Sequence, residues 1–298
     1  MKQLYQAPPH APYHRFLAGE SYQPMRSILG VVLALLSFSL VSALVAQLVL
    51  GIAWSIQGRP SSFGDYWRSA LAFERPSGVL AAHLGLGALI LLAWVLVRWV
   101  HLVEPRWIPS VQPGVRWRYL LLTLLVALVV LGTVLGLSLV LEPKAFRPQA
   151  DWPVFLAIIL LTAPLQAAAE EVFFRGYLFA AIGSLIPQRW AVIGVTALVF
   201  TLFHGVQNPA LFASRFAFGI IAGMLVSYTG GLEAPIAAHI VNNLLAFGLA
   251  MATSSVAEVR AITEIDGLTV FIDVAGFAVF GLVALWLGRR MNLATLSP

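Results

Sequence analysis

The sequence contains no cysteine and few charged residues. Without cysteine, its 298 residues can form neither a disulfide framework nor a thiolate metal site. Only 10% of the residues are charged, against about 25% in a typical soluble domain. Hydrophobic residues make up 60% of the chain, and the mean hydropathy is +0.88. The composition therefore excludes an ordinary soluble protein and predicts an integral membrane protein in a lipid bilayer.

The net charge of +5 is not that of a nucleic-acid-binding protein. Most of the 18 Lys and Arg residues lie in short segments between hydrophobic runs. Such a distribution is typical of membrane topology signals. We therefore expect no nucleic-acid partner.

Hydrophobic runs of about 20 residues predict an all-α, polytopic transmembrane helix bundle of about eight spans. Helices are expected because only helices and closed barrels satisfy the backbone in lipid, and these runs are too continuous for alternating barrel strands. The expected spans are 28–56, 78–100, 119–141, 153–185, 190–206, 210–229, 232–252 and 268–288.

The spans and their polar residues divide the chain into four parts. Residues 1–26 are polar and predict a loose cytosolic N-terminal tail, and residues 27–152 hold three N-terminal transmembrane helices. Residues 153–252 form the predicted core, because their spans carry Glu, Arg, His and Asn. Residues 253–298 hold the last loop and the C-terminal transmembrane helix.

The distribution of Lys and Arg favours an orientation in the cell membrane with both termini in the cytoplasm. In that orientation, six of the eighteen Lys and Arg residues lie in the outer loops and two lie within helices. The cytoplasmic segments hold the other ten, which are Lys2, Arg15, Arg26, Arg98, Arg106, Arg116, Arg118, Arg189, Arg289 and Arg290.

Two adjacent glutamates interrupt the fourth hydrophobic run. Each carboxylate there costs about 2.5–3.5 kcal/mol on insertion scales. Arg175 follows Glu171 by four residues, so the two share a helix face and are expected to pair. Glu170 points about 100° away. We expect it to remain free of Arg175, to face His204 and to act as a general base. The alternative is a purely structural ion pair.

Further polar residues follow in later spans. His204 lies in the fifth expected span, and His239, Asn242 and Asn243 lie in the seventh at positions i, i+3 and i+4. Taken singly, each is typical of interhelical hydrogen bonding. Combined with a carboxylate, they supply a base, a proton carrier or metal ligand, and an oxyanion donor. The set therefore predicts hydrolytic chemistry.

The depths of these residues constrain the bundle. Glu170 and His204 each lie 17 residues from Pro187, or about 25 Å along their helices. His239 lies only eight residues after Gly231, or about 12 Å. For all three to meet, we expect the hairpin at Pro187 to project beyond the bilayer. A Gly231 turn sunk into the bilayer is the alternative.

The motifs E-E-x-x-x-R, F-x-x-x-H and H-x-x-x-N follow one another on successive hydrophobic segments. In this order they resemble the CPBP family, which groups CAAX prenyl endopeptidases of the Ras-converting type with bacteriocin-processing and immunity-related membrane proteins. The resemblance covers roughly residues 153–252. It implies an intramembrane endopeptidase that hydrolyses a peptide bond of a membrane-associated or lipid-modified protein or peptide.

The resemblance also implies roles for single residues. Glu170 and His204 match the family positions thought to activate the attacking water. His239 and Asn243 match positions proposed to hold the oxyanion.

The remaining two motif residues, Glu171 and Arg175, match supporting positions.

The resemblance leaves open whether the reaction needs a metal, because Glu170, His204 and His239 could form a zinc site with an open water position. The HExxH helix signature is absent. A water activated by glutamate needs no metal, and the metal-free mechanism is slightly favoured.

Two other functions remain open. A non-catalytic membrane scaffold or immunity-type protein could retain the same fold and residues. Intramembrane Glu, His and Arg also build proton relays, as in a proton-coupled transporter. A transporter is expected to show an internal repeat, and none appears in the sequence.

Overall fold

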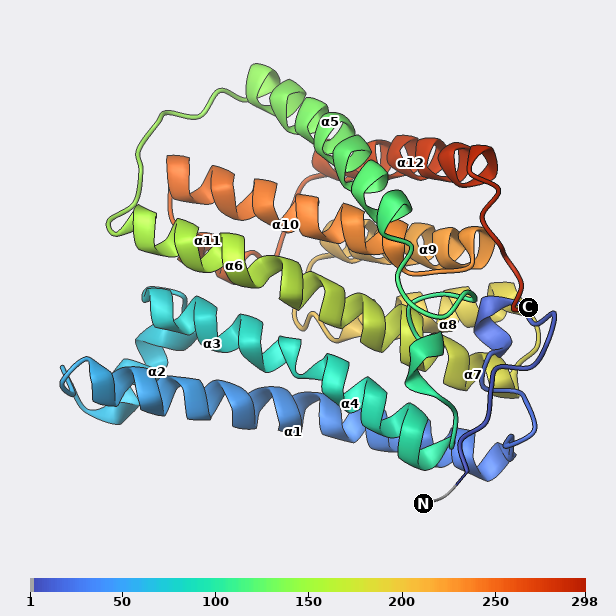
Figure 1. The fold of residues 1–298 in the computed structure, drawn as a ribbon. Helices are drawn as coiled ribbons and strands as arrows, with labels where there is room; N and C mark the ends of the chain where they lie inside the picture. The colour runs from blue at the N-terminus through green and yellow to red at the C-terminus, as the bar shows by residue number, and fades with distance from the viewer. Residues whose placement is uncertain (1–2) are drawn as a thin grey trace.

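The computed structural model describes residues 3–298 and shows an all-helical bundle, which confirms the predicted fold class (Figure 1). The α-helices are α1 (Pro24–Ile56), α2 (Phe63–Leu71), α3 (Pro76–Gly87), α4 (Leu89–Val95), α5 (Trp117–Leu141), α6 (Trp152–Glu171), α7 (Phe179–Leu185), α8 (Arg189–Leu202), α9 (Pro209–Thr229), α10 (Glu233–Thr253), α11 (Val256–Ala261) and α12 (Gly267–Arg290). Shorter helical segments are η1 (Tyr13–Arg15), η2 (Leu96–Val100), η3 (Pro105–Trp107) and η4 (Val172–Leu178). Lys2, one of the charges counted for topology, lies outside the described residues.

Seven stretches within residues 3–298 are long and apolar enough to cross a membrane. They are α1, α3 to η2, α5, α6 to α7, α9, α10 and α12. The chain is therefore an integral multi-pass membrane protein. The expected eighth span, 190–206, is corrected to the 14-residue helix α8, which is only about 21 Å long.

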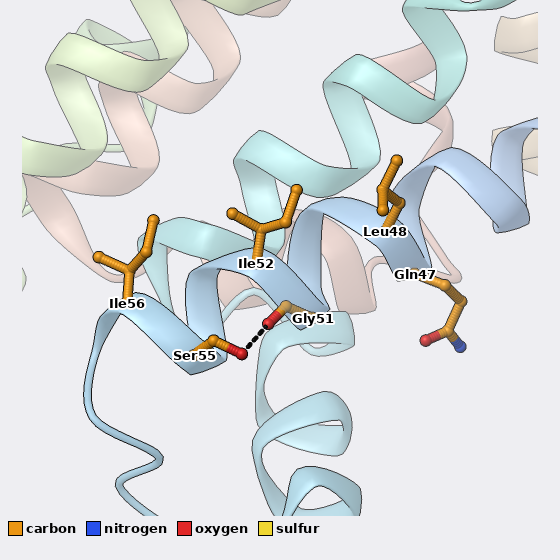
Figure 2. Close-up of a pocket in the computed structure, with 6 residues that line it drawn as sticks. All are labelled: Gln47, Leu48, Gly51, Ile52, Ser55 and Ile56. Atoms are coloured by element: carbon orange, nitrogen blue, oxygen red, sulfur yellow. Dashed lines mark hydrogen bonds between the residues drawn. The ribbon is translucent and has the colours of Figure 1, made fainter.

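The outer face of α1 carries exposed leucines at four-residue spacing. Leu36, Leu40, Leu44 and Leu48 are 59–70% exposed. Further along the same helix, Gln47 to Ile56 line a shallow hollow (Figure 2). All six of its lining residues come from α1, and none belongs to the glutamate motif. A continuous apolar stripe of this kind is rare on a soluble monomer and fits contact with lipid.

The longest helical stretch extends past the turn between α9 and α10. α6 continues through the π-helical segment η4 into α7, and a Cβ added to Gly176 would lie 3.3 Å from the Leu232 side chain. Leu232 belongs to the turn between α9 and α10, so α7 extends beyond that turn. The hairpin at Pro187 therefore lies past that turn, and α10 begins only six residues before His239. Its projection beyond the bilayer stays a prediction.

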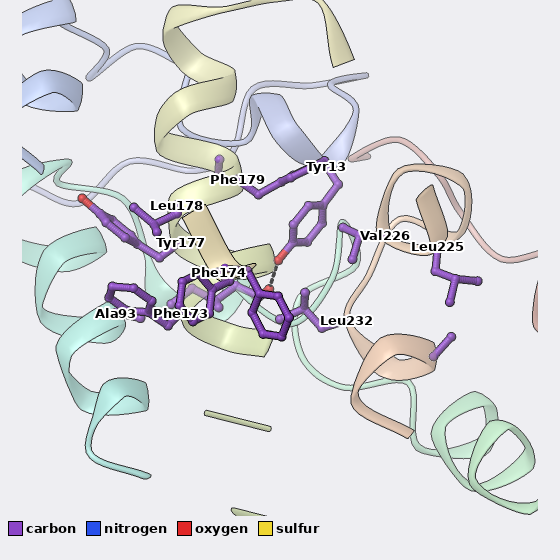
Figure 3. Packing of buried hydrophobic residues seen from close by; sticks show 14 of the residues in the cluster. Tyr13, Ala93, Phe173, Phe174, Tyr177, Leu178, Phe179, Leu225, Val226 and Leu232 are labelled. Carbon is purple, nitrogen blue, oxygen red and sulfur yellow. Dashed lines mark hydrogen bonds between the residues drawn. The ribbon is translucent and has the colours of Figure 1, made fainter. Parts of the chain in front are cut away.

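The N-terminal segment covers this projecting hairpin. The Tyr13 ring is 1% exposed and lies 6.5 Å from the Phe179 ring, measured between centroids (Figure 3). Arg15 donates hydrogen bonds to the carbonyls of Gly183 and Ser184 at 2.8 and 3.1 Å, which satisfies groups left free at the end of α7. The loose tail expected from the polar composition is therefore corrected: this segment is packed.

A buried ion pair fixes the start of α10. The guanidinium of Arg116 donates to both carboxylate oxygens of Glu233, at 2.9 and 2.6 Å. A third donor of Arg116 reaches the carbonyl of Thr229 at 2.7 Å. This contact ties the chain before α5 to the α9–α10 turn, and it fixes the start of α10 relative to α5.

Candidate active site

The polar residues of α6 and α10 meet across an antiparallel helix pair. His239 on α10 lies against the adjacent glutamates, with its Nδ1 2.8 Å from Glu171 Oε1. Four residues later on α10, Asn243 donates to Gln166 Oε1 at 2.8 Å, and Gln166 lies four residues before Glu170 on α6. The two contacts are four residues apart on α10 and five residues apart on α6. A single register therefore brings the E-E-x-x-x-R and H-x-x-x-N residues together.

The expected pair between Glu171 and Arg175 is confirmed. Arg175 Nη1 donates to Glu171 Oε1 at 3.0 Å, and both side chains are 0% exposed. The guanidinium carbon of Arg175 lies 3.9 Å from the centre of the Phe200 ring, at cation–π distance. Removing two charges from water costs several kcal/mol per ion, so the additional contact with Phe200 helps to keep Arg175 buried.

The carboxylate of Glu171 has a second partner that sequence analysis did not anticipate. Its Oε1 atom is shared by Arg175 and by His239. An ionised carboxylate only accepts hydrogen bonds, so the His239 nitrogen that faces it, Nδ1, must carry a proton. Glu171 therefore sets both the orientation and the protonated nitrogen of His239, whose Nε2 is directed toward Glu170.

The other glutamate is free of Arg175, as expected. Glu170 Oε1 accepts a hydrogen bond from Gln166 Nε2 at 2.7 Å. Its second oxygen, Oε2, lies 3.7 Å from His239 Nε2, which is too long for a hydrogen bond. Glu170 is 8% exposed, whereas Glu171 is fully buried. One oxygen of Glu170 is thus held in place while the other remains available to accept a proton.

No hydrogen bond joins Glu170 to His204 in the described residues. Among residues 3–298, the polar partner of the His204 ring is the carbonyl of Phe200, 2.8 Å from Nδ1. The reason is the short α8: it ends at Leu202, so His204 follows the helix end and bonds back to it. Its ring lies 4.6 Å from that of Phe200, the residue that also stacks on Arg175. His204 therefore lies beside the cluster but is not bonded to it.

The predicted metal ligands do not form a ligand set. Within the described part of the chain, no group of three or more His, Asp and Glu side chains is arranged to hold a metal ion. Glu170 and His239 are neighbours, and His204 bonds through its Nδ1 to the carbonyl of Phe200. In the described arrangement these three side chains do not form a His₂Glu zinc site, and the metal-free mechanism stays a prediction.

The fold and the polar cluster define a polytopic membrane protein with acid–base groups held inside its helix bundle. A protein-family model described as "Type II CAAX prenyl endopeptidase Rce1-like" matches residues 151–245. Over those residues the chain is therefore similar to Rce1-like domains of the CPBP family, a family of membrane-embedded proteases. The match includes every residue of the glutamate, His204 and His239 motifs.

A curated relative matches a longer stretch of the chain. The "Uncharacterized protein YyaK" of Bacillus subtilis (strain 168) is 25% identical over 161 residues, which are 51% of this chain and 54% of that protein. The chain therefore spans about half the length of this relative. No solved structure matches the chain significantly.

Proposed function

We propose that the chain is an intramembrane endopeptidase that hydrolyses a peptide bond in a membrane-associated or lipid-modified protein or peptide. The proposal rests on one observation, the set of contacts that the carboxylate of Glu170 makes. Its carboxylate is unpaired with Arg175, fixed at one oxygen by Gln166 and directed at His239 with the other. The similarity to Rce1-like domains supports proteolysis as the reaction.

In the proposed mechanism, Glu170 Oε2 accepts a proton from a water molecule while the water oxygen attacks the scissile carbonyl carbon. The carbonyl π electrons move to oxygen and form a tetrahedral oxyanion. When the oxyanion collapses, the C–N bond breaks, and Glu170 returns its proton to the leaving nitrogen. The products are a carboxylic acid and an amine. His204, beside the cluster, is proposed to orient the water.

The proposed oxyanion donors are His239 and Asn243. The Nδ1 proton of His239 is used on Glu171, so donation to an oxyanion requires a second proton on Nε2. Asn243 gives one amide hydrogen to Gln166 and retains another for the oxyanion. Loss of one such donor typically reduces kcat by about 10²–10³-fold.

The proposed location is the cell membrane, with both termini in the cytoplasm. The two ends of the described chain lie at the same end of the bundle in Figure 1, and the backbone of His10 bonds to that of Ser297. Of the ten Lys and Arg residues counted for this end, all but Lys2 are described. Their excess over the six at the opposite end supports this orientation.

The proposed function predicts a substrate that accumulates when Glu170 is removed. Membrane proteins of a wild-type strain, a deletion strain and a Glu170→Ala strain would be compared by quantitative proteomics. We expect one or more proteins that are uncleaved in both mutant strains and processed in the wild type. Identical processing in all three strains would rule out the proposed peptidase.

A metal-free mechanism predicts that chelators leave the activity unchanged. Purified protein that cleaves its substrate would be dialysed against EDTA and 1,10-phenanthroline, assayed, and analysed for bound metal. We expect full activity without stoichiometric metal, because a glutamate-activated water needs no Lewis acid. Activity that disappears with chelator and returns with zinc would show instead that a metal takes part.

A further inference from the structure

Gln166 lies between two members of the proposed catalytic machinery. Its Nε2 donates to Glu170 at 2.7 Å, and its Oε1 accepts from Asn243 at 2.8 Å. The side chain is 6% exposed, so water competes little for these bonds. None of the three motifs includes this residue. We propose that Gln166 is a positioning residue that holds Glu170 and Asn243 in one geometry, and this inference rests on the proposed function.

The direction of each hydrogen bond follows from charge. The carboxylate of Glu170 only accepts, so the Gln166 group that faces it must be the amide nitrogen. The Gln166 carbonyl is then left facing Asn243, which must present its own nitrogen. The charge of Glu170 thus fixes the orientation of both amides. Asn243 is held with its Nδ2 in the cluster, where its second hydrogen can serve an oxyanion.

The same contact decides which oxygen of Glu170 is available. With Oε1 bound to Gln166, Oε2 is the atom near His239 Nε2. The amide of Gln166 supplies a donor on one arm and an acceptor on the other without carrying a charge. Glutamate would place a second acceptor against Glu170, and methionine would offer neither strong group.

The test compares Gln166→Met and Gln166→Glu with the wild type, each also combined with Asn243→Ala. The probe is a quenched-fluorescent peptide, selected from a library in detergent micelles because wild-type protein cleaves it. We expect Gln166→Met to lower kcat by about 10–100-fold, as misplacement of catalytic groups does, while KM and the melting temperature change little. In the Asn243→Ala background the same substitution should cost much less, because the two residues act as a unit.

Gln166→Glu preserves the size and polarity of the side chain. It is the variant to measure if Gln166→Met folds poorly. It is expected to lose kcat as well. A wild-type kcat in either folded variant, or a loss that is fully additive with Asn243→Ala, would overturn the positioning role. Those results leave the peptidase assignment intact. That assignment fails separately if wild-type protein cleaves no peptide of the library, or if Glu170→Gln cleaves the probe as well as the wild type does.

Discussion

Replacing Glu170 by glutamine is expected to lower peptide hydrolysis by about 10²–10⁴-fold, the usual contribution of a general base. Glutamine keeps the size of the side chain, but its amide cannot accept the proton of the attacking water. The melting temperature in detergent should remain near that of the wild type, because Glu170 takes no part in the buried pair between Glu171 and Arg175. Both quantities can be measured on one purified sample, as kcat on a cleaved peptide and as a thermal unfolding midpoint.

The matched control is Asp273→Asn, which removes a different carboxylate from a membrane-spanning helix. Asp273 lies on α12, and in the described structure it makes no hydrogen bond to the Glu170 cluster. We expect this variant to cleave at the wild-type rate. If Glu170→Gln turned over normally, or if Asp273→Asn lost as much activity, the role assigned to Glu170 would be wrong.

The spans could be predicted from sequence because lipid requires long apolar helices, and hydropathy records them directly. The end of α8 could not, because the apolar pattern continues past Leu202 while the backbone turns at Gly205, which has a φ of 77°. Hydropathy reports which side chains tolerate lipid and not where a helix stops. For this reason the sequence placed His204 inside a span, whereas the structure places it just after the end of a short helix.

The N-terminal segment shows a related limit. Its polar composition favoured a loose tail, yet Tyr13 and its neighbours are buried against α7. The partner that buries them is 166 residues away in the chain, at Phe179. Burial of this kind depends on tertiary contacts, and no local pattern in residues 1–26 indicates it.

Within the site, contacts along one helix could be predicted and contacts between helices could not. The spacing of Glu171 and Arg175 predicts their pairing, since residues four apart share a helix face. The same spacing joins Gln166 to Glu170, and it was the signal that could have identified Gln166. The contact of His239 with Glu171 depends on how α10 is rotated against α6, which the H-x-x-x-N motif does not specify.

The largest effect on stability is expected from breaking the buried pair between Glu171 and Arg175. Arg175→Met should lower the free energy of unfolding by about 3–5 kcal/mol, because it leaves a buried carboxylate without its cation. The double variant Glu171→Gln/Arg175→Met should recover much of that loss, since a neutral pair of similar size leaves no uncompensated charge. Glutamine at 171 can still accept the Nδ1 proton of His239, so the site should also keep much of its shape.

Unfolding in detergent, followed by denaturant titration, would give the three free energies for this comparison. The control is Arg215→Met, which removes another arginine of the core helices. Arg215 is only partly buried, and its side-chain partner in the described structure is the neutral Gln207. Loss of Arg215 should therefore lower the free energy of unfolding far less than loss of Arg175.

If Arg175→Met unfolded like the wild type, or if the double variant were no more stable than Arg175→Met, Glu171 would not be the residue that holds the site in shape. Glu170→Gln should show the opposite pattern, with stability retained and hydrolysis lost, and that contrast separates the roles of the two adjacent glutamates.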